Sequence, residues 1–356
     1  MKRNTLILSG ISVLLLSLPL AAQQMPGSIF IHKDWQLVCD NTRTCSAAGN
    51  PAAEDELGIS LVLTRKAGKN QNVTGDIQLA RNEHLGLLKK LPARFALNMR
   101  VNGIDAGRLT IDQKKNLQAD LSEQQVALLI KSLASDSQIE FVIGDLRWHI
   151  SDQGAAAVFI KMDESQGRLG TRTALIKKGD KDEDTVLPAL PIPVVYAASV
   201  NLPQAGDDKF IATSYKALHK ELLSTLKADN YCADMQESST GKTKFAVTRL
   251  SADKLLINTR CSAGAYNTSD AYWVVNEKPP FQPALITVAA TEYKDGIISA
   301  TQLGSSVGHC WFADQWTWDG KKFVHTAAFS SSMCSPGPGS DRVLATFVSE
   351  VRRAGR

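Results

Sequence analysis

The apolar positions in the first half of the chain alternate along several short runs, a spacing typical of strands with one buried face. The clearest run is Asp34–Asp40, and a polar turn at 41–44 follows it. Similar runs lie at 59–65, 76–79, 95–101, 139–143 and 146–150. The Asn102-Gly103 pair after the third of these is a hairpin-turn signal. These runs predict several antiparallel strands.

Two stretches of the first half carry apolar residues at helical spacing instead. Ser122–Gln125 has the sequence of a capping box ahead of the first stretch. The second helix is expected to begin after Ser151 or Asp152, either of which could cap it, and to end at Gly167. Its apolar face consists of Ala155, Val158, Phe159 and Met162. Gln166 lies about 20° from that face at about 100° per residue, so we expect it to point toward the core.

The second half begins with a helical pattern and continues as strands. Asp207 or Asp208 could cap the helix. Its buried face is predicted to contain Ile211, Tyr215, Leu218, Leu222 and Leu226. Turns at 294–296 and at Asp319-Gly320 then predict two hairpins. The chain is therefore expected to be α+β, with two domains that are each mostly antiparallel β with one or two helices.

The length of 356 residues exceeds what one ordinary core holds, which favours two domains. A charged run at 177–184 leads into a segment with four prolines, at positions 188, 191, 193 and 203. Because proline-rich segments do not build helices or central strands, 177–206 is predicted to be a linker. The predicted plan is a signal peptide at 1–22, an N-terminal α+β domain at 29–176 and a C-terminal domain at 207–356.

The first residues have the features of a secretory signal peptide. Lys2 and Arg3 are basic, 6–20 is apolar, and Leu20-Ala21-Ala22 offers a small-residue cleavage site. The apolar run is too short for a membrane span, so we expect a periplasmic protein with no membrane insertion after cleavage. Loss of Lys2 and Arg3 leaves 38 basic and 36 acidic residues. That balance does not favour a nucleic-acid partner.

Six cysteines in an exported chain indicate disulfides. Pairing of nearest neighbours gives Cys39–Cys45, Cys232–Cys261 and Cys310–Cys334, with every bridge inside one domain. A zinc site is the alternative, but the sequence lacks a Cys-x-x-Cys pair and a histidine at the spacing that would complete a tetrahedral set. We therefore expect three disulfides and no metal site.

Four segments resemble an exported bacterial family known as domain of unknown function 1176. They are Asp34–Cys45, Ser151–Gly170, Gly264–Asn267 and the ending from Gly308 to Cys334. The resemblance implies an exported two-part protein of unassigned activity. It also implies that the first domain is distantly similar to the invasion-associated locus B proteins.

Two groups of residues are the candidates for a binding site. Asp163, Gln166 and Arg168 follow the second helix, and the arginine could bind a carboxylate or phosphate through two parallel hydrogen bonds. The alternative is structural: Gln166 caps buried backbone while Arg168 pairs with Asp163. Trp311, Trp316 and Trp318 could line a face that binds a sugar or a peptide. Packing across a hairpin is the alternative for these tryptophans.

The sequence contains none of the usual catalytic or nucleotide-binding motifs, so no catalytic residue, cofactor or metal ligand is assigned. It favours a protein that is not an enzyme, with an unknown protein or glycan of the cell envelope as its partner. The first alternative is an envelope hydrolase whose site is assembled across the domains. The second is an inhibitor of an extracellular hydrolase. The sequence gives no oligomeric state.

Overall fold

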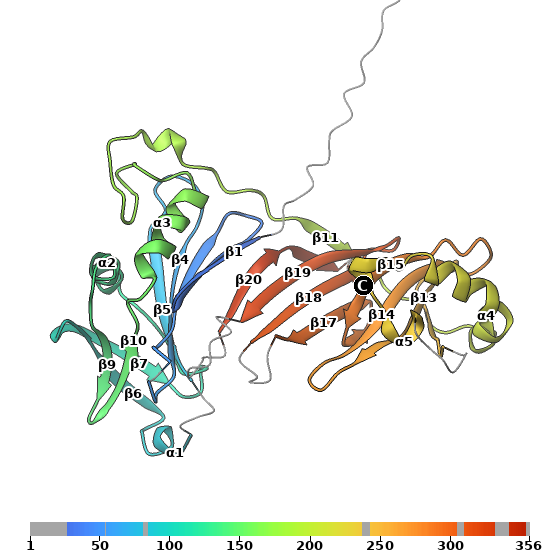
Figure 1. Cartoon of the computed structure of the whole chain (residues 1–356), viewed down its shortest axis with the longest axis horizontal. Helices are drawn as coiled ribbons and strands as arrows, with labels where there is room; N and C mark the ends of the chain where they lie inside the picture. The colour runs from blue at the N-terminus through green and yellow to red at the C-terminus, as the bar shows by residue number, and fades with distance from the viewer. Residues whose placement is uncertain are drawn as a thin grey trace, which may run out of the picture.

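The computed structural model describes residues 27–53, 55–80, 85–236, 243–304, 310–331 and 342–353. These residues form mostly antiparallel sheets with a few separate helices, which confirms the α+β prediction. Two sheets belong to the first half of the chain and two to the second half (Figure 1). A short two-stranded sheet is formed in addition by residues from the predicted linker and from the C-terminus.

The first domain contains two sheets. The first sheet has the order β1-β2-β3-β4-β5-β8, with β1 (Ser28–His32), β2 (Trp35–Cys39), β3 (Cys45–Gly49), β4 (Ile59–Arg65), β5 (Val73–Leu79) and β8 (Gln118–Asp120). The second sheet has the order β10-β9-β6-β7, with β6 (Arg94–Val101), β7 (Ile104–Asp112), β9 (Ile139–Ile143) and β10 (Leu146–Ile150). The predicted turn at Asn102 and Gly103 joins β6 to β7, and both residues have positive φ values.

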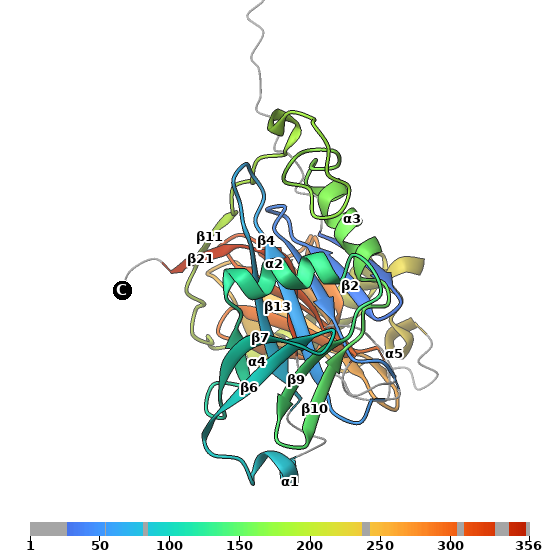
Figure 2. The same ribbon diagram turned by 90° about the vertical axis from the view of Figure 1, so that its left-hand side faces the viewer.

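Three helices accompany these sheets: α1 (Leu85–Leu88), α2 (Glu123–Ser132) and α3 (Ala155–Ser165). The capping box of Ser122 and Gln125 at the start of α2 is confirmed. Figure 2 shows α2 lying across the strands of the first domain, and α3 packs against β2. The apolar face of α3 is fully buried in the core between the sheets, where Phe159 meets Trp35 edge to face.

The predicted side-chain cap of α3 is wrong. Its N-cap is Gly154, with a φ of 102° and no capping hydrogen bond from a side chain. A Cβ at Gly154 would lie 2.1 Å from the carbonyl oxygen of His32, so the approach of β1 requires glycine there. Ser151 and Asp152 instead bind Asp34 and the backbone of Ser137. Gly167 ends the helix with a φ of 69°, as predicted.

The second domain begins with α4 (Asp207–Leu223) and the short α5 (Ala233–Gln236). The third sheet contains β12 (Ala246–Arg249), β13 (Lys254–Ala263), β14 (Thr268–Asn276) and β15 (Ala284–Ala290). The fourth sheet contains β16 (Glu292–Lys294), β17 (Ile297–Leu303), β18 (Trp311–Trp318), β19 (Phe323–Ser331) and β20 (Val343–Val348). Both predicted hairpin turns are present, between β16 and β17 and between β18 and β19.

The predicted cap of α4 is also wrong. Gly206 occupies the N-cap with a φ of 102° and no side-chain capping bond. The carboxylate of Asp207 instead accepts hydrogen bonds from both Nε and Nη2 of the buried Arg249. Leu218 and Leu222 are buried on the predicted face of the helix, together with Phe210. The side chain of Asp207, expected to cap the helix, thus binds Arg249 of β12, which is distant in sequence.

The predicted linker contains a 3-10 turn at Glu183–Thr185 and the strand β11 (Val194–Ala197). β11 pairs in parallel with β21 (Glu350–Arg353) in the two-stranded sheet. Pro193 comes immediately before β11, and such an edge position tolerates proline because the ladder is not interrupted.

The two domains meet where β20 packs against the outer face of the first sheet. Val38, Ala48, Val62 and Leu344 form a small buried cluster there. The Asn41 side chain bonds both backbone groups of Val348, at 3.0 and 2.7 Å. The amide of Gly27 donates to the carbonyl of Thr346 at 3.1 Å. Because both of its faces are covered, β2 is buried at all five positions.

Two of the expected disulfides are present in the structure. Cys39–Cys45 joins the ends of β2 and β3, and Cys232–Cys261 joins the start of α5 to β13. Cys334 lies outside the described residues, so the pairing of Cys310 with Cys334 stays a prediction.

Candidate functional site

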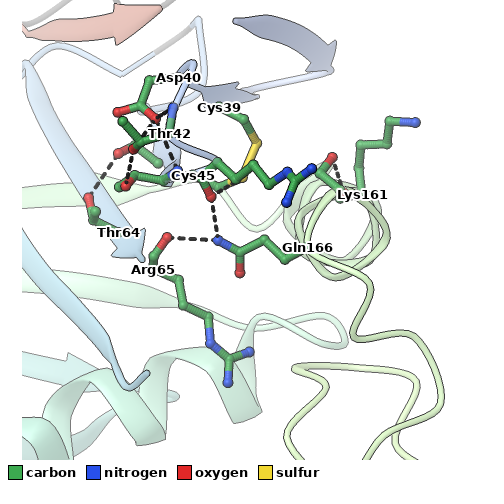
Figure 3. Close-up of a disulfide and its surroundings, with 12 residues drawn as sticks. Cys39, Asp40, Thr42, Cys45, Thr64, Arg65, Lys161 and Gln166 are labelled. Atoms are coloured by element: carbon green, nitrogen blue, oxygen red, sulfur yellow. Dashed lines mark hydrogen bonds between the residues drawn. A yellow bond between two sulfur atoms is a disulfide. The ribbon is translucent and has the colours of Figure 1, made fainter. Parts of the chain in front are cut away.

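Three polar residues at the end of α3 and in the turn after it are fully buried. Asp163, Gln166 and Arg168 each have 0% of their surface exposed. The amide nitrogen of Gln166 donates to the carbonyl oxygens of Arg43, at 3.0 Å, and Arg65, at 2.9 Å (Figure 3). Arg43 lies just before the start of β3 and Arg65 is the last residue of β4. Gln166 therefore links the end of α3 to the first sheet.

Arg168 uses its guanidinium inside the same network. Its Nε donates to Oε1 of Gln166 at 3.1 Å, its Nη1 to Oγ1 of Thr173 at 3.2 Å, and its Nη2 to the carbonyl of Gly68. The ion pair of Asp163 is with Arg65, at 3.6 Å, rather than with Arg168. The expected Asp163–Arg168 pairing is therefore replaced by a cluster that includes a second arginine from β4.

Burial controls the protonation of this cluster. It raises the pKa of Asp163 above the usual aspartate value, against hydrogen bonding by the Leu175 amide and the attraction of Arg65. Burial, together with the positive charge of the nearby Arg168, lowers the pKa of Arg65 to about 10. Charges that are this deeply buried require partners, and here the partners are protein groups.

Residues 171–187 cover the turn. Glu183 accepts hydrogen bonds from the backbone and hydroxyl of Thr173, at 3.1 and 2.8 Å. The amide of Leu187 donates to the carbonyl of Gln166 at 3.0 Å. The geometry thus gives Asp163, Gln166 and Arg168 structural partners and no access to solvent.

The three tryptophans do not share one surface. Trp318 is 1% exposed and lies in the core between the third and fourth sheets. Trp311 is half-buried at the other end of β18, where it pairs with Leu303. Trp316 is half-buried between them and pairs across the strands with His325.

Two hollows meet at His325 on the face of the fourth sheet, and we call them together the aromatic groove. The first hollow, of about 440 Å³, lies toward the first domain. It is lined by Gly27, Ile29, Phe312, Ala313, Asp314, His325, Ala328, Phe329, Thr346 and Phe347. The second, also of about 440 Å³, lies toward the third sheet. It is lined by Lys254, Val274, Gln282, Ala284, Leu285, Ile286, Trp316, Lys321, Lys322, Phe323 and His325.

Three aromatic rings form a row across the floor of the aromatic groove. The ring centroids of Trp316 and His325 are 5.4 Å apart, and those of His325 and Phe347 are 4.8 Å apart. The rings come from β18, β19 and β20, which lie side by side in the fourth sheet (Figure 1). Nε2 of His325 lies 2.8 Å from Oδ1 of Asp314, so the row carries a polar pair at its centre.

Sequence reasoning identified Trp316 but missed His325, Asp314 and Phe347. These three residues lie on three different strands, β19, β18 and β20. A β-bulge after Gln315 also shifts the register between β18 and β19. No local motif therefore joins them. Of the other histidines, His149 lies between Asp55 and Glu140, and His84 and His309 lie outside the described residues.

Within the described ranges, no three His, Cys, Asp or Glu side chains are grouped so that they could hold a metal ion. No helix in the same part of the chain is long and apolar enough to cross a membrane.

A family model described as a protein of unknown function (DUF1176) matches residues 29–347. The chain belongs to this family. The match includes both sheets of the first domain and the fourth sheet, so the DUF1176 region contains nearly all of the aromatic groove. An uncharacterized protein of Escherichia coli, YpfG, is 24% identical over 333 residues, which cover 86% of this chain and 89% of that protein. No solved structure matches this DUF1176 protein.

Proposed function

We propose that this DUF1176 protein is exported to the periplasm and acts there as a non-catalytic binding protein. Its ligand, a glycan or protein of the cell envelope, lies in the aromatic groove. The predicted signal peptide and the two disulfides support the location, because disulfides persist in oxidising compartments.

The observation that carries the proposal is the row of Trp316, His325 and Phe347 between two open hollows. Pockets of about 300 to 1,000 Å³ that combine aromatic walls with a few polar groups are typical ligand sites. Ile29 and Phe312 at the rim are 43% and 45% exposed. Exposed apolar side chains that surround a polar pair favour recognition of a partner over simple packing.

The His325–Asp314 pair favours a hydrolase as the second candidate. A carboxylate that orients a histidine is the arrangement of a general base, and this pair lies close to where the two domains meet. A base of this kind activates a hydroxyl, a thiol or water. In the described part of the chain, however, Asp314 is the one side chain hydrogen-bonded to the His325 ring, so binding is the function that the geometry supports better.

Calorimetric titration of the mature protein with defined probes tests the proposal. The probes are chitotetraose, a hyaluronan tetrasaccharide and a tetraglutamate peptide. At least one probe should bind, and Trp316→Ala should weaken that binding at least tenfold, while Trp311→Ala on the same strand should not. Equal binding by the Trp316→Ala variant would place the site elsewhere. Hydrolysis of a nitrophenyl ester or glycoside that His325→Ala abolishes would support the hydrolase instead.

A further inference from the structure

We infer that the ligand of the aromatic groove is an oligosaccharide that carries carboxylate groups. This inference rests on the proposed binding function and adds the chemical class of the ligand. It depends on three features: the row of aromatic rings on the floor, whose planes are inclined by 46° and 35°, the unequal charge of the two hollows, and the pairing of the strands beneath them.

The floor suits sugar rings because it offers apolar faces beside polar groups. Trp316, His325 and Phe347 succeed one another at 5.4 and 4.8 Å between centroids, so adjacent sugar units could each lie on a ring. A sugar presents an apolar C–H face and a polar rim of hydroxyls, and an amphipathic aromatic site meets both needs. Asp314 lies beside this row and supplies an acceptor for hydroxyl groups.

The second hollow is basic. Lys254, Lys321 and Lys322 line it, and among its described lining residues none is acidic. The nearby Asp319 is engaged elsewhere, since its Oδ1 accepts from the backbone amides of Lys321 and Lys322, at 2.8 Å each. The carboxylate therefore fixes the turn that presents the two exposed lysines to the hollow. Such a local excess of positive charge attracts an anionic group.

The first hollow has the opposite character and gives the ligand a direction. Asp314 lines it, together with Ile29, Phe312 and Phe347 and without a lysine or arginine among the described lining residues. A ligand carboxylate in this hollow would meet a like charge. We therefore place a neutral sugar unit over His325 and Phe347 and the acidic unit toward Trp316 and Lys322.

The strands beneath the groove argue against an extended peptide. A peptide that adds to a sheet needs an edge strand with free backbone groups. β18 pairs with both β17 and β19, and β19 pairs with both β18 and β20, so their backbone groups are already used in the sheet. β20 is the edge strand, but its outer side faces the first domain, where Gly27 bonds the carbonyl of Thr346 and Asn41 bonds both backbone groups of Val348. An apolar helix would have to cover the His325–Asp314 pair, and this desolvation is unfavourable.

The test compares two tetrasaccharides of similar length by calorimetric titration of the mature protein. The acidic probe is a hyaluronan tetrasaccharide, and the neutral probe is chitotetraose. We expect the acidic probe to bind at least tenfold more tightly and to weaken as salt is raised. The double variant Lys321→Ala/Lys322→Ala should lose at least tenfold in affinity for the acidic probe. The matched control is Lys177→Ala/Lys178→Ala, two adjacent exposed lysines at the start of the predicted linker, and this variant should bind as the wild type does.

The outcomes separate this inference from the proposed function. Equal affinity for both tetrasaccharides, with loss in Trp316→Ala, would overturn the acidic class and leave the groove as a binding site. Tighter binding of tetraglutamate than of either sugar, again with loss in Trp316→Ala, would make the ligand a peptide. Failure of the hyaluronan tetrasaccharide to bind the folded protein would also overturn the inference. Circular dichroism of each variant establishes that a lost signal does not come from unfolding.

Discussion

The turn after α3 and the aromatic groove are built from similar side chains in opposite surroundings. Asp163 and Arg168 have no exposed surface, whereas the side chains of Asp314 and His325 are 43% and 34% exposed. In the turn, the side chains of Gln166 and Arg168 donate hydrogen bonds to backbone carbonyl oxygens. These carbonyls belong to Arg43, Arg65 and Gly68. In the groove, the polar pair faces solvent between aromatic rings.

This difference shows why a polar residue near the core is poor evidence of function. A buried charge has to be neutralised or paired by the protein itself, so its hydrogen bonds are used for stability. A half-exposed pair retains capacity for a ligand, because water occupies the remaining positions until the ligand arrives. The turn is therefore expected to stabilise the first domain, and the groove is the region in which we propose recognition.

The largest effect is expected at the turn. Arg168→Ala removes three hydrogen bonds and leaves Oε1 of Gln166, Oγ1 of Thr173 and the carbonyl of Gly68 without this donor in a buried site. Loss of one member of a buried charged network costs about 3 to 5 kcal/mol in the free energy of unfolding. Urea unfolding followed by tryptophan fluorescence measures this cost. Arg172→Ala, an exposed neighbour, is the control. A loss below about 1 kcal/mol for Arg168→Ala would contradict a structural role.

A smaller effect is expected where the groove meets the first domain. A Cβ at Gly27 would lie 2.1 Å from the carbonyl oxygen of Thr346 and 2.4 Å from that of Cys39. Gly27→Ala should therefore separate β1 from β20, with a loss of about 2 to 3 kcal/mol. Because Gly27 also lines the first hollow, probe binding should weaken too.

The control for the Gly27→Ala substitution is Gly86→Ala, where an added Cβ would have no neighbour within 4 Å. Unfolding and titration are measured on both variants. Unchanged probe affinity in Gly27→Ala, despite lower stability, would show that the ligand does not use the hollow next to the first domain.

The second domain also contains a buried arginine, Arg249. It tests whether burial gives an arginine a structural role in this domain as it does in the first. Arg249 is 2% exposed and binds Asp207, and this hydrogen bonding lowers the pKa of Asp207 below its usual value. A carboxyl with a lowered folded pKa adds stability above its unfolded pKa of about 4, and that stability is lost as the pH falls through the folded value. Asp207→Asn should cost about 1 to 2 kcal/mol at pH 7.

Unfolding of wild type and Asp207→Asn from pH 7 down to pH 3 tests this assignment. The gap between them should shrink below about pH 4, because the carboxyl of the unfolded wild-type chain takes up a proton there while the folded chain still holds the carboxylate. Asp208→Asn, on the exposed neighbour, should show no gap at any pH. A gap that persists unchanged at pH 3 would mean that the charge of Asp207 is not what stabilises the domain.

The sequence predicted most of the fold because strand alternation and helical spacing are local. It predicted the burial of Gln166 from the helical angle alone. It failed where a distant segment decides: Gly154 caps α3 because of the carbonyl of His32, and Arg65 from β4 takes the place expected for Arg168. The groove could not be predicted, since only strand register and bulges bring His325 against Trp316 and Phe347 against His325.

The smallest effect on stability is expected at the centre of the groove. His325→Gln removes a ring that is one-third exposed and keeps an amide of similar reach beside Asp314. Surface changes of this kind usually stay within about 0.5 kcal/mol, so the urea midpoint should barely move. Probe binding should fall, because the middle ring of the row is lost. His219→Gln, which removes a half-buried ring stacked on Tyr215 away from the groove, should leave binding intact. If His325→Gln instead costs more than about 1 kcal/mol and binding persists, then the His325–Asp314 pair is a structural brace like the turn after α3, and the proposed contrast between the two regions is wrong.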